Sequence, residues 1–407
     1  MANQLSEQLD ACKNIHVAAD QTLPPTELRA VTQEALGVSN CSVESYQRGQ
    51  TYIRYNNGDK TFLILLKAVS YLGNPHPIFK KRIQLADWFQ DFYREKRQTE
   101  PSAEVVLLGV YHYNDCTLFV RFGTETYMQR GLHNSSAHVY INDLYQGLTY
   151  GIFEKIDQNG NLIGVARPDK FRAYLLGEKK RTLFDIFANF NSGFPFGKWI
   201  YALDAIKYMR DNGGSQWRQT EWAGWLLEFL FSNFLKNNNI KTQIRYIGLS
   251  NKKDDDYDFD LHFEDNNFYG DLKASDIKQA ETPGNDAESL QSCILEYERF
   301  WYVIYEHLTI KDVDRNLQAC HERYELLKAD NPKWDKGPTS YAARMKNSVR
   351  FVKMSIIELN RINYKDVLSE FHQGRQPDGN PRRMKFNIKK KYLNDDNLVV
   401  FRYIFAE

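Results

Sequence analysis

The stretch that decides the fold is Phe259-Asp260-Leu261-His262-Phe263, followed after four intervening residues by Phe268-Tyr269-Gly270-Asp271-Leu272-Lys273-Ala274. Apolar and polar residues alternate along both segments, which is typical of β-strands that bury one face. Asp260 and His262 share the polar face of the first segment, and Asp271 and Lys273 share that of the second. The pattern predicts a hairpin that brings two carboxylates and one ammonium group to the same spot.

The segments around this hairpin complete an ordered set of elements. Hydrophobic spacing predicts an amphipathic helix over Trp217–Lys236 and a strand over Thr242–Leu249 before it. After the hairpin, we expect a helix over Ala287–Arg299 and an apolar strand over Phe300–Glu306. The expected order is therefore α-β-β-β-α-β, with further helices and a final strand over Leu398–Phe405.

Two carboxylates beside an ammonium group suit the hydrolysis of a phosphodiester. Asp260 and Asp271 offer the oxygen ligands that Mg²⁺, a hard cation, prefers. Such a metal lowers the pKa of a bound water and stabilises charge on the phosphoryl oxygens. Lys273 can orient the attacking water and add positive charge. We therefore expect Asp260 and Asp271 to be metal ligands and Lys273 to be catalytic.

This arrangement resembles the PD-(D/E)xK superfamily of nucleases. Asp260, followed eleven residues later by Asp271-Leu272-Lys273, matches the family motif, although Phe259 stands where the motif has proline. The resemblance covers roughly residues 215–306 and implies a restriction-endonuclease-like core, with Mg²⁺ as the cofactor and Mn²⁺ able to substitute. It also implies DNA cleavage that leaves 5′-phosphate and 3′-hydroxyl ends.

Many members of this family add a glutamate from the helix that precedes the strands. Glu221 and Glu228 lie seven residues apart and so share one face of the predicted helix. Glu228 is nearer the middle of the amphipathic run, which makes it the preferred catalytic candidate. Glu221 is the alternative, and a solvated charge on the helix surface is the ordinary interpretation of either.

The acidic residues before the hairpin leave alternatives open. Asp256 and Asp258 have the parity of Asp260, so either is an alternative first ligand. The D-x-D-x-D spacing also occurs in calcium loops, but the glycine and glutamate that such a loop needs are absent. A solvated run of charges followed by an accidental Asp-x-Lys is a further alternative. For His262, a hydrogen-bonded structural role is favoured over a phosphate contact.

The first part of the chain indicates a β-rich domain with short helices at its start. Turn signals at Asn56-Asn57-Gly58 and Asp157–Gly160 lie between runs typical of strands. Residues 26–48 predict two short helices, with a spacing that loosely resembles a helix-turn-helix, although an ordinary helical hairpin is the simpler interpretation. A helix is predicted over Lys80–Lys96.

These patterns give a fold of the mixed α+β or α/β class with two domains. Residues 1–176 are expected to form a β-rich DNA-recognition domain. Glycines and a proline favour a linker over 177–200, and residues 201–407 are expected to form the nuclease domain.

Bulk composition restricts the partners only weakly. The chain of 407 residues has a net charge of +1, so any phosphate-binding surface must be a local patch. Scattered cysteines without metal-ligand spacing favour a cytoplasmic location, and no apolar run is long enough to predict a membrane span. The candidates for contacts with DNA are Lys80, Lys81, Arg82, Asn134, Ser135, Ser136, Arg344, Arg382, Arg383, Lys385 and Lys389.

The sequence thus predicts a type II restriction endonuclease that cuts double-stranded DNA at a specific sequence. Cleavage of both strands generally requires two active sites, so we expect a homodimer, at least on DNA. A DNA repair or modification-dependent nuclease of the same fold is the nearest alternative. A non-catalytic DNA-binding protein is the second alternative, and a protein that binds metal structurally and no nucleic acid is the third.

Overall fold

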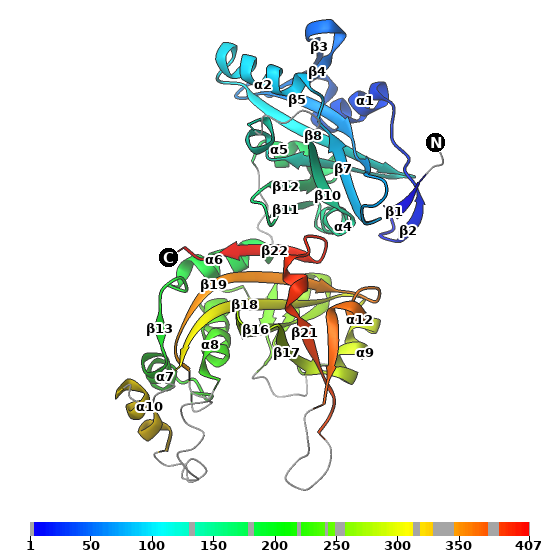
Figure 1. Cartoon of the computed structure of the whole chain (residues 1–407). Helices are drawn as coiled ribbons and strands as arrows, with labels where there is room; N and C mark the ends of the chain where they lie inside the picture. Colours follow the sequence, from blue (N-terminus) through cyan, green and yellow to red (C-terminus); the bar gives the residue numbers. More distant parts are fainter. Residues whose placement is uncertain are drawn as a thin grey trace. The chain divides into compact units, whose positions relative to one another are not determined.

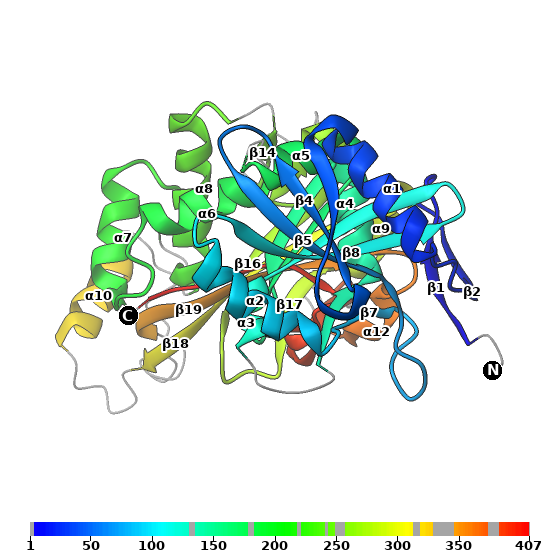
Figure 2. The same cartoon turned by 90° about the horizontal axis from the view of Figure 1, so that it is seen from above.

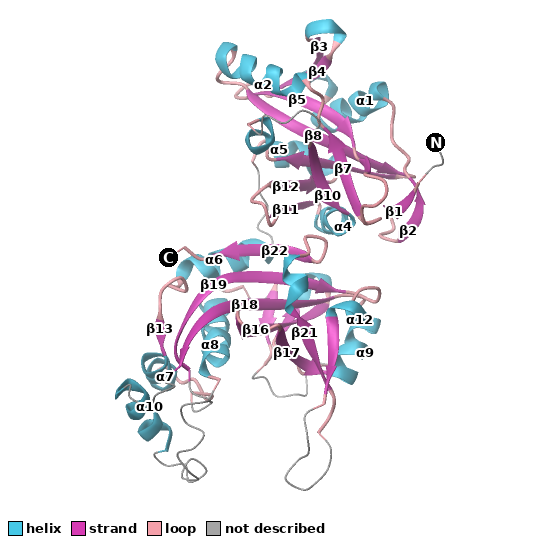
Figure 3. Cartoon of the chain, viewed as in Figure 1, coloured by secondary structure: helices cyan, strands magenta, loops and turns pink. Residues whose placement is uncertain are grey.

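The computed structural model describes residues 4–129, 135–177, 183–217, 221–240, 243–248, 257–311, 318–328, 346–372 and 382–406. The chain divides into two compact units, Met1–Lys180 and Arg181–Glu407 (Figure 1). Each unit combines helices with more than one sheet, so the fold is mixed α/β (Figure 3). No described helix is long and apolar enough to cross a membrane.

A seven-stranded sheet with the order β11-β12-β9-β8-β5-β4-β3 forms the centre of the first unit. Its strands are β3 (Cys41–Ser45), β4 (Thr51–Asn56), β5 (Thr61–Ala68), β8 (Glu104–Tyr113), β9 (Cys116–Phe122), β11 (Ile152–Ile156) and β12 (Leu162–Ala166). Figure 2 shows β4, β5 and β8 side by side. Only the β5–β8 pair within this sheet is parallel. A parallel pair needs a crossover, and α2 lies in the connection.

Helices and two smaller sheets complete the first unit. The helices are α1 (Pro25–Leu36), α2 (Trp88–Thr99), α3 (Thr124–Met128), α4 (Ile141–Tyr150) and α5 (Pro168–Leu175). The smaller sheets pair β1 (Leu5–Leu9) with β2 (Ile15–Ala19), and β7 (Lys80–Gln84) with both β6 (Ser70–Tyr71) and β10 (Ser136–Tyr140). Residues of α1 and α5, including Leu28 and Phe171, pack with β4, β5 and β8 in one buried cluster.

Two helix predictions in the first unit are wrong. Residues 26–48 do not form two helices, because α1 is followed by a short 3₁₀ turn and then by β3, which pairs with β4. The helix predicted over Lys80–Lys96 begins only at Trp88, since Lys80–Gln84 forms β7. In β7 the buried residues are Lys81 and Ile83. Because one of these two positions holds a lysine, the alternation of apolar and polar residues that marks a strand was not visible in the sequence.

The second unit is built on a sheet with the order β13-β19-β18-β16-β15-β14, with β22 also paired to β19. Its strands are β13 (Ile200–Tyr201), β14 (Ile244–Tyr246), β15 (Leu261–Phe263), β16 (Phe268–Asp276), β18 (Phe300–Lys311), β19 (Lys346–Leu359) and β22 (Val399–Ile404). A smaller sheet has the order β17-β21-β20, formed by β17 (Glu281–Asp286), β21 (Lys385–Lys389) and β20 (Leu368–Phe371). The described helices are α6 (Leu183–Gly193), α7 (Ala202–Asp211), α8 (Trp222–Asn237), α9 (Ala287–Tyr297), α10 (Gln318–Lys328) and α12 (Tyr364–Val367).

Helices pack on both faces of this sheet. On β18, Tyr302 and Ile304 pack in one buried cluster with Leu290 of α9. The neighbouring Trp301 points to the other face, where Phe184 of α6 stacks on it with the ring centroids 5.3 Å apart. β18, which pairs in parallel with β16 and antiparallel with β19, is therefore buried on both sides because helices cover both faces of the sheet.

Two expectations for the second half of the chain need correction. The segment 177–200 is not a simple linker, because it contains α6, whose Phe184, Phe187 and Phe190 are buried. Of the turn residues that favoured a linker, Gly177 precedes this helix and Gly193 ends it, so only Pro195 and Gly197 follow it. The region after β18 is not mainly helical either, since β19 pairs along its length with β18 and its residues from Met354 to Leu359 are buried.

Candidate active site at the Asp260–Asp271 hairpin

The register of the hairpin places Asp260 beside Asp271. β15 pairs with β16 in antiparallel register, with Leu261 opposite Gly270 and Phe263 opposite Phe268. Asp260 precedes β15 by one residue and Asp271 follows Gly270, so continuing the register sets the two aspartates opposite each other. A turn that ends at Asn267 in the left-handed conformation (φ 45°, ψ 65°) joins the strands.

The apolar face of the hairpin fixes this position. Leu261, Phe263 and Phe268 are buried, and the two phenylalanine rings stack with centroids 4.4 Å apart. Gly270 is required here, because a Cβ atom at this position would lie 2.7 Å from the backbone oxygen of Trp301. A tightly packed hairpin is a rigid support for catalytic groups.

The two aspartates and Lys273 contact one another directly. The backbone N–H of Asp260 donates to Asp271 Oδ1 over 3.2 Å, and the N–H of Leu272 donates to Asp260 Oδ2 over 2.9 Å. Lys273 Nζ forms an ion pair with Asp271 Oδ2. Each carboxylate is thus held by the strand that carries the other; the ammonium group pairs with Asp271 and acts on Asp260 through its charge.

Glu228 joins this group from α8, whereas Glu221 does not. The hydroxyl of Tyr246, on β14, donates to Glu228 Oε2 over 2.8 Å. Glu221 is the N-cap of α8, and its exposed carboxylate forms an ion pair with Lys346 at 2.6 Å. The two glutamates share a helical face by spacing, but they are two turns apart along the axis.

The electrostatics of the four groups leave negative charge in excess. Burial, followed by the charges of Asp271 and Glu228, raises the pKa of Asp260 well above its ordinary value. Burial is also the main reason that the pKa of Glu228 rises to about 7. Burial alone would lower the pKa of Lys273, but Asp271 and Asp260 outweigh it and raise the pKa. Three carboxylates around one ammonium group are stable only if they take up protons or another cation.

Asp260 and Asp271 fit a divalent cation in their chemistry. Within the described residues, no group of three or more His, Cys, Asp or Glu side chains forms a metal site by itself. Mg²⁺ does not need such a cage, because it commonly binds through one or two carboxylates and keeps several waters. The surplus negative charge at Asp260, Asp271 and Glu228 favours a cation of this kind.

Asp258, one of the two alternative first ligands, is not part of this cluster. Asp258 is exposed and borders a surface pocket with Glu288 and Arg383, while Asp256 lies outside the described residues. The ring of His262 stacks on Tyr269 and contacts Asn267 at 3.1 Å. These contacts give His262 a structural role.

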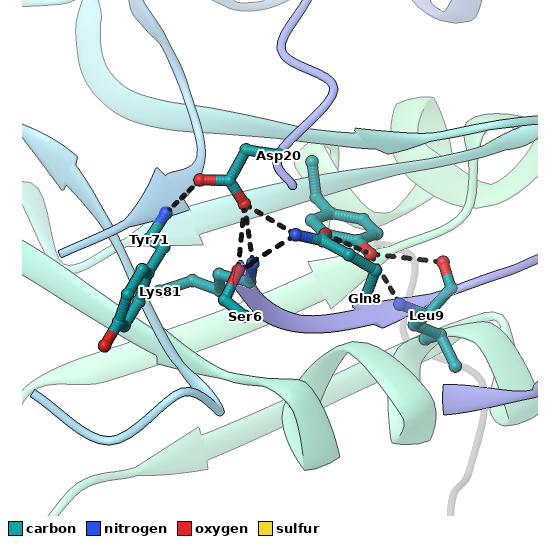
Figure 4. A network of polar contacts seen from close by, with 7 residues as sticks. Ser6, Gln8, Leu9, Asp20, Tyr71 and Lys81 are labelled. Carbon is teal, nitrogen blue, oxygen red and sulfur yellow. Dashed lines mark hydrogen bonds and ion pairs between the residues drawn. The ribbon is translucent and has the colours of Figure 1, made fainter. Parts of the chain in front are cut away.

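Lys81 is wrongly assigned as a DNA contact, because its side chain is completely buried. Its ammonium group donates to Ser6 Oγ and to Asp20 Oδ1, both over 2.7 Å (Figure 4). Asp20 also accepts hydrogen bonds from Gln8 and from the backbone N–H of Tyr71. Lys81 therefore ties the N-terminal hairpin to β7.

The other DNA candidates of the first unit fall near β7 and β10. Arg82 donates to Ser136 Oγ over 3.2 Å, and Lys80 Nζ lies 5.9 Å from the centroid of the Tyr140 ring. Ser135 precedes β10 and is half-buried, and Asn134 lies outside the described residues. Lys80, Arg82 and Ser136 thus form one partly exposed patch.

The basic candidates of the second unit lie at the small sheet. Arg382 and Arg383 are exposed and precede β21, where Lys385 pairs with Asp286 of β17. Lys389 donates to the backbone oxygen of Asp366 over 2.9 Å. Arg344 lies outside the described residues.

The small sheet adjoins the carboxylates through a tyrosine that the sequence did not single out. Tyr302 pairs with Asp271 in the parallel register of β16 and β18, and its hydroxyl donates to Asn285 Oδ1 over 2.8 Å. Asn285 is next to Asp286, the partner of Lys385. Tyr246 and Tyr302 were missed because a tyrosine in an apolar strand has no local signal that separates a polar contact from core packing.

A comparison with protein families gives one match. The family model described as Methylase-associated X1 matches residues 60–175, which lie in the first unit. This match links the chain to restriction–modification systems. No curated protein and no solved structure matches the chain.

Proposed function

We propose that the chain is a Mg²⁺-dependent DNA endonuclease of a restriction–modification system, with its active site on the second unit. The observation that carries this proposal is the direct contact among Asp260, Asp271 and Lys273 on one hairpin, with Glu228 beside them. The order α8, β14, β15, β16, α9, β18 supports it, because the PD-(D/E)xK resemblance implies that order. In this structure β17 is inserted before α9.

The residues have separable tasks in this proposal. Asp260 and Asp271 would hold Mg²⁺, which when bound supplies an activated water and neutralises phosphoryl charge. Lys273, oriented by its ion pair with Asp271, places a positive charge where a phosphate oxygen would lie. Glu228, with a pKa of about 7, is able to hold or release a proton near neutral pH.

A nucleic-acid path toward this site is proposed along the basic end of β21. Arg382, Arg383 and Lys385 lie near the end of the β17–β21 pair that leads through Asn285 to Tyr302. Cations beside a hydrolytic site position the DNA backbone without reading its sequence. Base recognition is assigned to the first unit, to which the methylase-associated match belongs.

The decisive experiment is digestion of unmodified DNA by the wild-type chain and by Asp260→Asn and Asp258→Asn, with Mg²⁺ and with EDTA. Asp258 is the matched control, since it is exposed, nearby and of the same parity. We expect discrete fragments from wild type and Asp258→Asn, and none from Asp260→Asn or in EDTA. The reverse pattern would make Asp258 the ligand, and cutting by both variants would reject the site.

Further substrates separate the alternative functions. A modification-dependent nuclease would cut only methylated DNA, and a repair nuclease would prefer branched or damaged DNA. Binding without cutting on every substrate would identify a non-catalytic DNA-binding protein. The proposed homodimer is tested by measuring the molar mass of the chain with and without DNA in Ca²⁺.

A further inference from the structure

A polar pocket of about 850 Å³ lies in the first unit, and all of its lining residues belong to that unit. The turn between β3 and β4 borders it on one side, and the ends of β5 and β7 and the start of α2 border it on the other. The side chains that matter are Trp88, Gln50, Gln84, Arg48 and Lys67. Pockets of this size commonly hold small organic groups.

The aromatic wall of the pocket is already in place. Trp88 stacks on Tyr46, with centroids 5.5 Å apart and planes 27° apart, and it meets Phe89 and Phe92 edge-on. The hydroxyl of Tyr46 donates to Glu95 of α2 over 2.9 Å. These contacts hold the half-buried indole in a fixed orientation at the pocket.

Four polar side chains beside this wall form no hydrogen bond or ion pair with other residues in the described part of the chain. The side-chain amides of Gln50 and Gln84 form no hydrogen bond with another described residue. Arg48 and Lys67 form no ion pair there, and Lys67 Nζ lies 5.6 Å from the centroid of the Phe89 ring. Asp91, which also borders the pocket, is paired with Arg94 at 2.7 Å.

The turn that carries Arg48 has an unusual backbone. Arg48 adopts φ 56° and ψ 33°, the left-handed region that a long side chain rarely occupies. Such conformations are concentrated at ligand-binding sites. Here the conformation belongs to the same turn as Gln47 and Gly49, which places the guanidinium at the border of the pocket.

We infer that this pocket receives a nucleobase turned out of a DNA strand. The indole of Trp88 provides an aromatic contact for the base, and the amides of Gln50 and Gln84 can pair with its Watson–Crick edge. Arg48 and Lys67 would hold the flanking phosphates. This inference rests on the proposed function only in taking DNA as the partner, and it does not require cleavage.

The test measures DNA binding by the full chain in EDTA, so that cleavage plays no part. One labelled duplex carries an adenine opposite an abasic site, and a second carries two opposed abasic sites. The first offers an unpaired base that is easily turned out, and the second has similar flexibility but no base. We expect the wild type to bind the first duplex at least about 10-fold more tightly.

Variants connect that preference to the pocket. Gln84→Ala removes an exposed amide, so it is not expected to affect folding, and it should reduce the preference to about 3-fold or less, as should Trp88→Ala. Gln98→Ala, on the exposed part of α2 outside the pocket, is the matched control and should keep the preference.

Three results would overturn the inference. Equal binding of both duplexes, or an unchanged preference in Gln84→Ala, rejects the pocket even if Mg²⁺-dependent cleavage is observed. Absence of any DNA binding at low salt rejects DNA as the partner, and with it the proposed function. Loss of cleavage in the Asp260 variant, with the base preference intact, would leave the two sites separate and both supported.

Discussion

Lys81 and Lys273 each lie on a strand beside carboxylates, but their surroundings differ. The ammonium group of Lys81 is completely buried, and Ser6 and Asp20 accept its hydrogen bonds. The side chain of Lys273 is 22% exposed and faces Asp271, with Asp260 and Glu228 close enough to affect its pKa. We call the first the closed cluster, because its ammonium group is buried, and the second the open cluster, because its lysine reaches solvent, although Asp20 is 23% exposed and Asp271 only 2%.

The pKa of Asp20, the ion-pair partner of Lys81, is shifted in the opposite direction to the pKa values of Asp260 and Glu228 near Lys273. Asp20, which contacts Lys81 and accepts three further hydrogen bonds, has a pKa below its ordinary value despite the opposing effect of burial. Glu7, farther from the ammonium, has a pKa raised by burial. Asp260 and Glu228 both have raised pKa values, because one lysine cannot balance three acids. The Lys81 cluster thus favours an ionised Asp20, although burial lowers the pKa of Lys81 itself, while the candidate metal site leaves negative charge to be balanced.

The largest expected effect is on cleavage. Asp271→Ala removes a proposed metal ligand and the partner of Lys273, so the initial cleavage rate in Mg²⁺ should fall by at least about 100-fold. The folded state should persist, which circular dichroism checks. A rate within a few-fold of wild type would show that chemistry occurs elsewhere.

Loss of the closed cluster should instead reduce stability. Lys81→Met leaves Asp20 half-buried without its cation, and we expect the free energy of unfolding of the first unit to fall by about 3–5 kcal/mol. Lys80→Met, on the same strand, is the control and should cost less than about 1 kcal/mol. Urea denaturation measures both, and equal effects would contradict the distinction drawn between the clusters.

Stability in EDTA should depend on pH through the open cluster. In the fold the pKa of Glu228 is about 7, above its ordinary 4.5, so the folded chain keeps a proton that the unfolded chain releases. This contribution is present at low pH and is lost as the pH rises from about 4.5 to about 7, by up to roughly 3 kcal/mol. Glu228→Gln should flatten this part of the profile, and an unchanged profile would mean that Glu228 does not titrate there.

The smallest effect is expected from metal binding itself. With a Kd near 1 mM, 10 mM Mg²⁺ should stabilise the wild type by about 1.4 kcal/mol. Asp260→Asn should remove most of this gain, whereas Lys81→Met should keep it. Thermal denaturation with and without Mg²⁺ provides the comparison, and a gain equal in all three chains would indicate nonspecific binding.

The same two clusters explain what the sequence could predict. The shared faces of Asp260, Asp271 and Lys273 follow from alternation within two short strands, which is local information. The burial of Lys81 depends on Ser6 and Asp20, which are 75 and 61 residues away along the chain. A basic triplet in isolation resembles a surface patch, so the DNA contact expected of Lys81 and the helix expected to begin at Lys80 were wrong, while the contacts expected of Lys80 and Arg82 stay predictions.

Long-range pairing also explains the other differences. The element order from α8 to β18 follows strong local periodicity, but β19 is a strand because it pairs with β18 and β22. The choice between Glu228 and Glu221 required the position of the helix start, which is the least certain feature of a sequence-based prediction. The contact from Tyr246 to Glu228 joins two separate elements and has no sequence signature.

The Lys81 cluster has a consequence for how the first unit could be exchanged between proteins. The methylase-associated match spans residues 60–175, which include Lys81 but exclude Ser6, Gln8 and Asp20. A recombination event that transferred only this span would bury an unneutralised ammonium group. The transferable module is therefore longer than the recognisable family, and it must carry the N-terminal hairpin of β1 and β2 with it.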